Sequence, residues 1–291
     1  MPMKYVVITN TFRREPNLVA RSLKASLNQE FRPEKVILID QNKPALEIDH
    51  TLLNNPRLEI QHVDAKCVSV ARNRASYPTD IDWIVFCDDD GYMDKNYSKV
   101  LFNSIKAFPE IRIFAGSIIR DDNLGYYSPR HRIGGDINKF RNTKLLMGSN
   151  FAIHSKTFSE LDKFDELFGT GSHWGSGEES DFAWKAFFSK VQMRYLQNLI
   201  VYHVKPYNGD LKHSIHKAYN YGIGKGALIS KWLLKRKKLI VIYELVEMTL
   251  VPIIKCLKGL LRLNKAEILI SLSSLKGRYI GIIKGYKFYR S

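Results

Sequence analysis

Three consecutive aspartates, Asp88-Asp89-Asp90, directly follow a strand-like apolar run over residues 82–87. Neighbouring carboxylates repel one another, which raises their pKa values unless a cation neutralises them. Mg²⁺ and Mn²⁺ prefer such oxygen ligands, and Mg²⁺ usually keeps coordination positions for substrate phosphates. The aspartates therefore predict a divalent cation site for a phosphate-bearing substrate. The alternative is a solvated acidic turn formed around Asp90-Gly91.

A second group of carboxylates follows a glycine-rich stretch, in Gly175-Ser176-Gly177-Glu178-Glu179-Ser180-Asp181. The helix predicted over residues 178–190 would begin at these acids, and its dipole favours their ionised forms. An ionised carboxylate can take a proton from a substrate hydroxyl, which makes Glu178, Glu179 and Asp181 candidate general bases. The alternative is ordinary helix capping by one of the serines, with acids in the first turn.

Further polar residues end predicted strands at the same sheet edge. Asp40 can accept a hydrogen bond from a nucleobase ring N–H, and the alternative is an aspartate that forms a turn. Arg72, near the start of a predicted helix, could meet a diphosphate, and the alternative is a surface salt bridge. His203 ends the last predicted strand and is a candidate metal ligand or a structural histidine. Other residues at this edge are Thr9, Asn10, Arg13 and Asn73.

The elements that would position these residues predict a wound α/β sheet with helical crossovers. Unbroken apolar runs such as 36–39 are typical of parallel strands buried on both faces. The predicted strands span 5–9, 36–40, 58–62, 82–87, 111–119, 145–155 and 199–203. The predicted helices span 16–29, 69–76, 97–108, 178–190 and 213–238, the last interrupted by glycines. Residues 120–146 predict a long loop that could close over a substrate.

The composition indicates one large α/β domain with an appendage, because the 291 residues are 45% hydrophobic. The three cysteines are far apart in sequence, which excludes a zinc knuckle or a CxxC redox motif. Their small number indicates a reducing compartment. The first residues contain no signal-peptide pattern, so we expect a cytoplasmic protein.

The charge of the chain is concentrated at its C-terminal end. The net charge is +16, and residues 205–291 hold 18 Lys and Arg against 4 Asp and Glu, a net +14. Residues 1–204 hold the other 27 basic and 25 acidic residues, a net +2. The basic tail therefore needs an explanation separate from the sheet.

The tail predicts amphipathic helices at an anionic membrane surface. Lys235-Arg236-Lys237-Lys238 precedes a strongly apolar stretch over residues 239–263 that also carries charges. These charges argue against a membrane-spanning helix, whereas basic clusters beside apolar helix faces bind anionic leaflets. We expect no nucleic-acid partner, because no recognisable nucleic-acid module is present. A homo-oligomerisation domain with a basic outer face is the alternative.

Taken in order, the motifs resemble family 2 glycosyltransferases with the GT-A fold, over roughly residues 4–230. The matching segments are Val6–Arg14, Val36–Asp40, Val68–Asn73, Ile84–Asp90, Gly148–Ala152 and Gly177–Asp181. The resemblance implies a mixed, mostly parallel sheet flanked by helices over residues 1–205, followed by a basic amphipathic helical extension over 206–291. Each motif is weak alone, and their order makes the set specific.

The resemblance also implies roles for the site residues. Mn²⁺ or Mg²⁺ would be ligated by Asp90, Asp88 and His203, and a nucleoside-diphosphate sugar would be the donor. Glu179 takes the position of the usual base, where the family commonly has Glu-Asp and this chain has Glu178-Glu179. Asp181 and Glu178 stay as further candidates. The residues implied in donor binding are Thr9, Asn10, Arg13, Asp40, Arg72, Asn73, Asp88 and Asp89.

The implied enzyme is a hexosyl- or deoxyhexosyltransferase. It would move a sugar from a UDP or dTDP donor to a hydroxyl of a glycan or polyprenyl-linked acceptor, by metal-assisted inverting displacement. Its place would be the inner face of the cell membrane, in surface polysaccharide synthesis. One alternative is a haloacid dehalogenase-like phosphatase that uses Asp88 and Asp90, although Tyr92 departs from that family's signature. Another is a non-catalytic membrane-binding protein.

Overall fold

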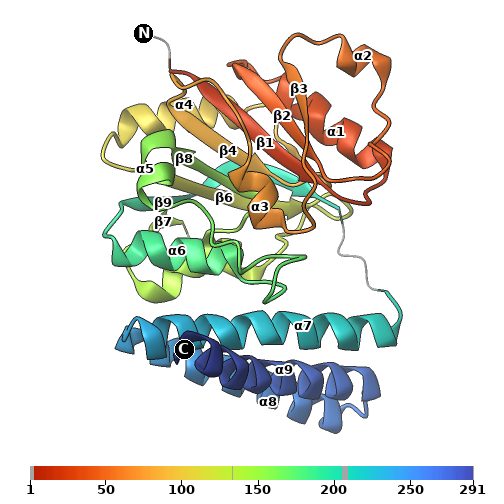
Figure 1. The fold of residues 1–291 in the computed structure, drawn as a ribbon, viewed down its shortest axis with the longest axis vertical. Coiled ribbons are helices and arrows are strands. Elements are labelled where there is room, and N and C mark those ends of the chain that lie inside the picture. Colours follow the sequence, from red (N-terminus) through yellow and green to blue (C-terminus); the bar gives the residue numbers. More distant parts are fainter. Residues whose placement is uncertain (1–2, 133, 205–208, 291) are drawn as a thin grey trace. The chain divides into compact units, whose positions relative to one another are not determined.

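The computed structural model describes residues 3–132, 134–204 and 209–290, and these divide into two compact units (Figure 1). The first unit comprises Met1–Asp165 and Phe182–Lys205, and the second comprises Glu166–Asp181 and Pro206–Ser291. The segment Glu166–Asp181, which lies within the predicted domain of residues 1–205, groups with the second unit, and the predicted division into domains stays a prediction. The predicted domain boundary, between residues 205 and 206, lies outside the described residues.

The first unit is built on one mixed sheet with the strand order β3-β2-β1-β4-β8-β6-β9-β5, and β7 pairs with β9. Strands β1 to β4 run parallel, and the antiparallel strand β8 separates them from β6 and β9, which run parallel to each other. Most strands thus share one direction, as predicted. The strands are β1 (Tyr5–Thr11), β2 (Lys35–Asp40), β3 (Leu58–His62), β4 (Trp83–Cys87), β5 (Gly91–Met93), β6 (Ile113–Arg120), β7 (Gly135–Asp136), β8 (Asn150–His154) and β9 (Met193–His203).

Helices flank this sheet (Figure 1). They are α1 (Pro16–Leu27), α2 (His50–Leu53), α3 (Val68–Asn73), α4 (Tyr97–Ala107), α5 (Ser155–Glu160) and α6 (Glu178–Phe188), whose first four residues belong to the second unit. The apolar runs that predicted the central strands are buried throughout: β4 has five buried residues in succession. Burial on both faces of the sheet explains why these strands show no alternation in the sequence.

The segment predicted as a long loop over 120–146 contains local structure instead. It includes β7 and the 3₁₀ turns η1 (Pro129–Arg132) and η2 (Phe140–Leu145). His131 is fully buried. Burial lowers the pKa of its imidazole, and this effect is larger than that of the backbone hydrogen bond with Ile118, which raises the pKa. Because a buried neutral histidine anchors this segment to β6, the segment is packed rather than structureless.

The second unit is helical. It contains α7 (Leu211–Ile229), the π-helical turn η3 (Ser230–Lys235), the 3₁₀ turn η4 (Leu239–Val241), α8 (Ile242–Leu261) and α9 (Lys265–Arg290). The glycines predicted to interrupt the first helix do not break α7. A methyl group on Gly226 would overlap the carbonyl oxygen of Arg278, and one on Gly281 would overlap that of Ile223. The glycines therefore let the backbones of α7 and α9 touch.

Helix α8 buries Glu244 and exposes many of its apolar residues. Glu244 is 1% exposed, and its Oε2 accepts a hydrogen bond of 2.8 Å from Lys225 Nζ on α7. Among the described residues, no helix combines the length and the apolarity needed to cross a bilayer. The exposed apolar residues from the start of η4 to just beyond the end of α8 are called the apolar face below. They are Leu239, Ile240, Ile242, Tyr243, Val246, Leu250, Val251, Ile253, Ile254, Leu257, Leu260, Leu261 and Leu263.

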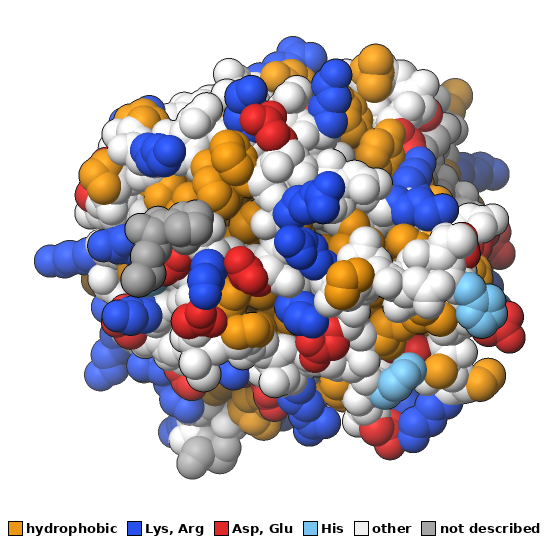
Figure 2. All heavy atoms as spheres, turned by 90° about the horizontal axis from the view of Figure 1, so that it is seen from above, with side chains coloured by type: hydrophobic (Ala, Val, Ile, Leu, Met, Phe, Trp, Pro, Cys, Tyr) orange, Lys and Arg blue, Asp and Glu red, His pale blue; other side chains and the backbone are white. Residues whose placement is uncertain are grey.

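The face drawn in Figure 2 intersperses Lys and Arg with Asp and Glu and with scattered hydrophobic side chains. This mixture is typical of an ordinary solvated surface.

Candidate functional site

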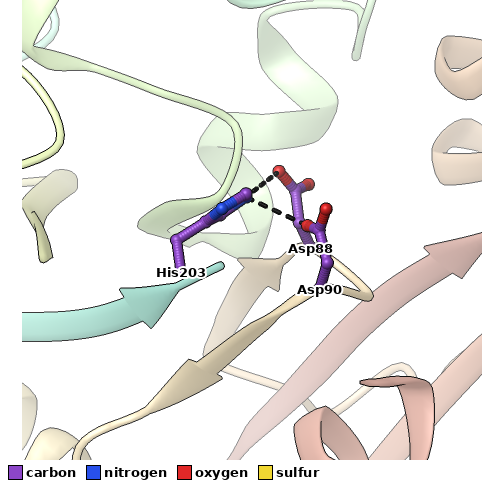
Figure 3. Close-up of side chains that lie close together, drawn as sticks. All are labelled: Asp88, Asp90 and His203. Carbon is purple, nitrogen blue, oxygen red and sulfur yellow. Dashed lines mark ion pairs between the residues drawn. The ribbon is translucent and has the colours of Figure 1, made fainter. Parts of the chain in front are cut away.

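Asp88, Asp90 and His203 form a group whose ligand atoms all lie within 4.8 Å of one another (Figure 3). The sheet explains this proximity. Asp88 and Asp90 lie in the turn between β4 and β5, and the antiparallel pairing of β5 with β9 sets Gly91 opposite His203. His203 Nε2 lies 3.0 Å from Asp90 Oδ1 and 3.9 Å from Asp88 Oδ2. Two carboxylates and an imidazole are a donor set suited to a divalent cation.

The orientation of His203 is fixed from its other side. Its Nδ1 lies 2.9 Å from the carbonyl oxygen of Val204. An Nδ1–H that donates to a carbonyl leaves Nε2 as the ligand atom, as is usual for histidines that bind metals. Burial lowers the pKa of His203, but the hydrogen bond and the charge of Asp90 outweigh it and raise the pKa to about 9. When no cation is bound, His203 is therefore protonated at pH 7 and supplies a positive charge beside Asp90.

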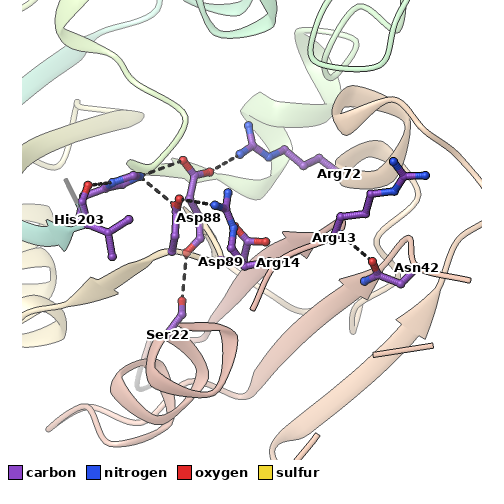
Figure 4. A network of polar contacts seen from close by, with 10 residues as sticks. Arg13, Arg14, Ser22, Asn42, Arg72, Asp88, Asp89 and His203 are labelled. Atoms are coloured by element: carbon purple, nitrogen blue, oxygen red, sulfur yellow. Dashed lines mark hydrogen bonds and ion pairs between the residues drawn. The ribbon is translucent and has the colours of Figure 1, made fainter. Parts of the chain in front are cut away.

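Arg14 forms ion pairs with Asp89 and Asp90. Its Nε lies 3.0 Å from Asp89 Oδ1 and its Nη1 lies 3.0 Å from Asp90 Oδ2 (Figure 4). Burial raises the pKa of Asp89 to about 6 despite the charge of Arg14. Burial would also raise the pKa of Asp90, but His203 and Arg14 bring it below its usual value. Asp89 is thus more easily protonated than Asp90.

Arg72 lies against the same turn. Its Nη2 donates to Asp88 Oδ1 at 2.8 Å (Figure 4). Its Nε donates to Asn10 Oδ1 at 3.0 Å. The side chain is 3% exposed, and its buried Nη1 has no hydrogen-bond partner in the described part of the chain. Ser22 Oγ donates to the carbonyl oxygen of Asp88 at 3.1 Å and fixes the backbone of the turn. The structure thus brings Asn10 and Arg72 to the aspartates, as the sequence suggested.

Asp40 organises the turn after β2. Its Oδ1 accepts from the backbone N and the Nδ2 of Asn42 at 2.9 and 2.6 Å, and its Oδ2 accepts from Leu46 N at 2.8 Å and lies 3.3 Å from His62 Nδ1. These contacts use the four lone-pair positions of a carboxylate. They match the turn-forming alternative, and a nucleobase contact by Asp40 stays a prediction. Asn42 Oδ1 in turn accepts from Arg13 N at 2.6 Å.

Two other predicted donor-binding residues serve packing in this structure. Thr9 is fully buried in β1. Asn73 clamps a distant segment: its Nδ2 donates to the carbonyl oxygen of Phe164 at 2.9 Å, and its Oδ1 accepts from Phe164 N at 3.0 Å. The donor-binding roles of both residues stay predictions.

The candidate bases belong to the second unit. Gly175 and Gly177 adopt φ values of +74° and +100°, a region that favours glycine, and so turn the chain into the first residues of α6. Glu178 and Glu179 are half-buried and line a cavity of about 330 Å³ within this unit. Asp181 is fully buried, and its Oδ1 accepts from Lys231 Nζ at 2.6 Å and from Trp232 Nε1 at 2.7 Å. Asp181 is thus enclosed by structural contacts.

Sequence reasoning did not single out Arg14, Lys231 or Trp232. Arg14 adjoins Arg13 after β1, and a basic residue at that strand end was the available signal. Lys231 and Trp232 are 50 and 51 positions from Asp181, and nothing in the local pattern relates them to it.

Comparisons with known proteins agree with this architecture. The family model "Glycosyl transferase family 2" matches residues 6–168. No curated protein is significantly similar to the chain in sequence. Among solved structures, S. aureus TarS 1–349 in complex with UDP-GlcNAc is similar, with a TM-score of 0.54 at 15% identity over 96% of this chain and 92% of that chain. A second structure of S. aureus TarS 1–349 gives a TM-score of 0.53 at 16% identity over 96% of this chain and 91% of that chain.

At such identities the solved structures show the fold alone, and they confirm the predicted fold class, a GT-A α/β fold with helices at its C-terminal end. The phosphatase alternative finds no support in the family match. Because that match covers more than half of the sequence, the chain belongs to glycosyl transferase family 2.

Proposed function

We propose that the protein transfers a sugar from a nucleoside-diphosphate donor to an acceptor hydroxyl, with inversion at the anomeric carbon. The observation that carries the proposal is the convergence of Asp88, Asp90 and His203 at the ends of β4 and β9. In open α/β sheets, ligands bind beyond the carboxyl ends of the strands. The site has the composition and the position that a diphosphate with a cation needs.

The residues of this site fit a divalent cation. Asp90 Oδ1, an Asp88 carboxylate oxygen and His203 Nε2 would hold Mn²⁺ or Mg²⁺. The turn holds three carboxylates, and the arginines paired with them, Arg14 and Arg72, bring only two positive charges. A further positive charge can therefore be accommodated there. When bound, the cation supplies the charge that stabilises a departing diphosphate.

Arg72 is the residue we assign to the donor phosphates. A buried N–H with no partner is costly, and a phosphate oxygen is the strongest acceptor for a guanidinium. The solved TarS structures hold UDP-GlcNAc or UDP, which supports a UDP-sugar as the donor, with a dTDP-sugar as the second choice. The transferred sugar is proposed to be a hexose or a deoxyhexose, which makes the enzyme a hexosyltransferase or a deoxyhexosyltransferase.

Glu179 is the proposed general base. Its carboxylate takes the proton of the acceptor hydroxyl while that oxygen forms a bond to the anomeric carbon of the donor. The bond from this carbon to the diphosphate oxygen breaks at the same time, and the nucleoside diphosphate leaves with the electron pair. Inversion follows because one displacement occurs from the face opposite the leaving group. Glu178 is the second candidate, since it lines the same cavity.

A transfer assay with UDP-sugars, Mn²⁺ and a panel of glycan acceptors tests this proposal. We expect Glu179→Gln to abolish transfer while UDP binding stays near that of the wild type. Asp90→Asn should reduce both. Full activity of Glu179→Gln would move the base to Glu178, and equal activity in EDTA would refute a cation at the aspartates.

The second unit is proposed to hold the enzyme at an anionic membrane surface, on the cytoplasmic side. The apolar face follows a helical spacing, for example Val246, Leu250, Ile254 and Leu257. Basic residues border it at both ends, in Lys235–Lys238 and at Arg262 and Lys265. An apolar stripe bordered by cations fits the headgroup region of an anionic leaflet. A polyprenyl-linked or surface-polysaccharide acceptor would be available there, and a homo-oligomer is the competing use of this face.

A further inference from the structure

A groove lies between η3 and the last turns of α9, within the second unit. Its volume is about 610 Å³, which is in the range of sites for small molecules. The described residues that line it are Leu234 of η3 and Ile282, Ile283, Tyr286, Lys287 and Arg290 of α9. This lining combines an apolar part with two cations, and it includes no acidic side chain from the described part of the chain.

The two elements that form the groove are fixed against each other. Gly285 of α9 packs so closely on η3 that a methyl group added to it would lie 2.9 Å from the Cβ of Ser230. Ser230 Oγ also donates to the carbonyl oxygen of Ile282 at 2.8 Å. A further contact anchors η3, because Lys231 Nζ donates to the fully buried Asp181 at 2.6 Å. The walls of the groove are therefore set before any ligand enters.

The apolar part of the groove is exposed. Leu234 is 42% exposed, Ile283 is 56% exposed and Tyr286 is 43% exposed. These side chains come from two elements that are far apart in the sequence and line one groove, so they form a patch rather than scattered surface residues. Exposed apolar patches with a polar rim mark interaction sites. A hydrocarbon chain that lies along these side chains would remove them from water.

The charge at the groove is positive. Lys287 and Arg290 line it, and Lys235 Nζ lies 5.1 Å from the ring centroid of Tyr289, near the same end of α9. None of these three cations forms an ion pair with a described residue. Residues 205–291 hold only four acids, and none of them lines the groove: Asp210, Glu244, Glu247 and Glu267. The groove is therefore complementary to a ligand that joins an apolar chain to an anionic group.

We propose that this groove binds one anionic lipid, with the hydrocarbon chain along Leu234, Ile282 and Ile283 and the phosphate at Lys287 and Arg290. Hydrogen bonds from a guanidinium or an ammonium group to a phosphate are strong. The assignment rests on the proposed membrane association of the second unit, and it adds a site for a single lipid to the apolar face. A second copy of the chain fits less well, since a symmetric contact at the groove would bring the same cations together.

Titration calorimetry on the full chain tests the groove with dodecyl phosphate, used below the concentration at which it forms micelles. Dodecyl maltoside supplies the chain without the charge, and inorganic phosphate supplies the charge without the chain. Ile283→Glu places an acid in the groove. Leu272→Glu is the matched control, because Leu272 is 49% exposed on α9 and does not line the groove.

A second pair of variants tests the charge. The double variant Lys287→Gln and Arg290→Gln removes both cations from the lining. The double variant Lys265→Gln and Lys276→Gln is its control, because these lysines are exposed on α9 and do not line the groove. Circular dichroism confirms that each variant is folded.

We expect dodecyl phosphate to bind the wild type and both controls alike. Dodecyl maltoside and inorganic phosphate should each bind about tenfold or more weakly, since each uses only one part of the groove. Ile283→Glu and the double variant at Lys287 and Arg290 should weaken the binding of dodecyl phosphate by a similar factor. Equal binding of dodecyl maltoside, or binding of dodecyl phosphate that Ile283→Glu leaves unchanged, would overturn the proposal. A dimer in light scattering that Ile283→Glu disrupts would assign the groove to a second copy instead.

The double variant Leu257→Glu and Leu260→Glu separates the groove from the apolar face. It should bind dodecyl phosphate like the wild type, although it should no longer float with vesicles rich in phosphatidylglycerol. Loss of dodecyl phosphate binding in this variant would place the ligand on the apolar face and overturn the groove. A wild type that floats but does not bind dodecyl phosphate would reject the groove and leave the membrane association standing. A wild type that binds dodecyl phosphate through Ile283 but does not float would reject the membrane association and support the groove.

Discussion

His203 Nε2 lies 3.0 Å from Asp90 Oδ1, across the antiparallel pairing of β9 with β5. In the protein without a cation, this contact raises the pKa of His203 to about 9 against the opposing effect of burial. A cation and a proton therefore compete for the same nitrogen. This competition makes metal binding and stability depend on pH in defined directions.

The first prediction concerns metal affinity. Because His203 is protonated at pH 7, binding of Mn²⁺ must release that proton. The affinity for Mn²⁺ should rise about tenfold per pH unit up to about pH 9 and then level off. Titration calorimetry in two buffers of different ionisation enthalpy measures the release. In His203→Gln the release of this proton should disappear, and an affinity that does not change with pH in the wild type would refute the competition.

The second prediction concerns stability without metal. The pKa of His203 is about 9 in the folded protein and near its ordinary value of 6.5 in the unfolded chain. The pair therefore contributes its full stabilisation below about pH 6.5 and loses it as the pH rises through about 9. Urea unfolding in EDTA should show a steeper fall in the free energy of unfolding over this range for the wild type than for His203→Gln. Parallel curves would show that the pair contributes nothing.

The third prediction concerns the buried pair of Asp181 and Lys231. Lys231→Met would leave the carboxylate of Asp181, which is fully buried, without its cation. Breaking a buried pair on one side costs about 3–5 kcal/mol. Urea unfolding measures the loss. Lys43→Met, which removes the same side chain from an exposed pair with Asp64, is the control and should change stability little. Equal stability of the two variants would contradict the structural role of Lys231.

The features that could be predicted from the sequence are those that leave a local pattern in it. Unbroken apolar runs predicted β2 and β4, and the strand ends correctly placed His203 with Asp88 and Asp90, because a sheet brings successive strand ends to one edge. Pairs between distant side chains leave no local pattern, so the contacts of Arg14 and of Lys231 could not be predicted.

A helical extension over residues 206–291 was predicted, but the bounds of α9 within it were not, for a different reason. It packs on α7 through Gly277, Gly281 and Gly285 rather than through a stripe of large apolar residues. The spacing of large apolar residues in the sequence therefore does not indicate which side of α9 is buried. The glycines of α7 were for the same reason taken as interruptions, although they mark the places where the two backbones meet.

The fourth prediction tests that glycine contact. Gly281→Ala would place a methyl group on the backbone of Ile223 and should destabilise the protein by about 1–3 kcal/mol, in spite of alanine's better helix propensity. At Gly125, where an added methyl group would meet only the side chain of Asn123 at 3.1 Å, the same substitution is the control. Thermal unfolding compares them. A Gly281→Ala variant as stable as the wild type would show that the helices can separate at little cost.

The fifth prediction concerns the apolar face. Replacing Leu257 and Leu260, which are 54% and 52% exposed, by glutamate should abolish flotation with vesicles rich in phosphatidylglycerol and leave folding intact. Leu124→Glu, at a residue 70% exposed in the first unit, is the control and should float like the wild type. If the wild type does not float and light scattering shows a dimer that the double variant disrupts, the face is an oligomer interface instead.

The proposed function depends above all on the binding of a nucleoside diphosphate through a cation at Asp88, Asp90 and His203. Titration calorimetry with UDP, with and without Mn²⁺, measures it on the full chain, with Asp90→Asn as the variant that removes one ligand. We expect UDP to bind the wild type in Mn²⁺ and EDTA to weaken this binding strongly. UDP should bind the Asp90→Asn variant equally in Mn²⁺ and in EDTA. No binding of UDP or dTDP to the wild type in either condition, or equal binding to it in Mn²⁺ and EDTA, would contradict the proposed function.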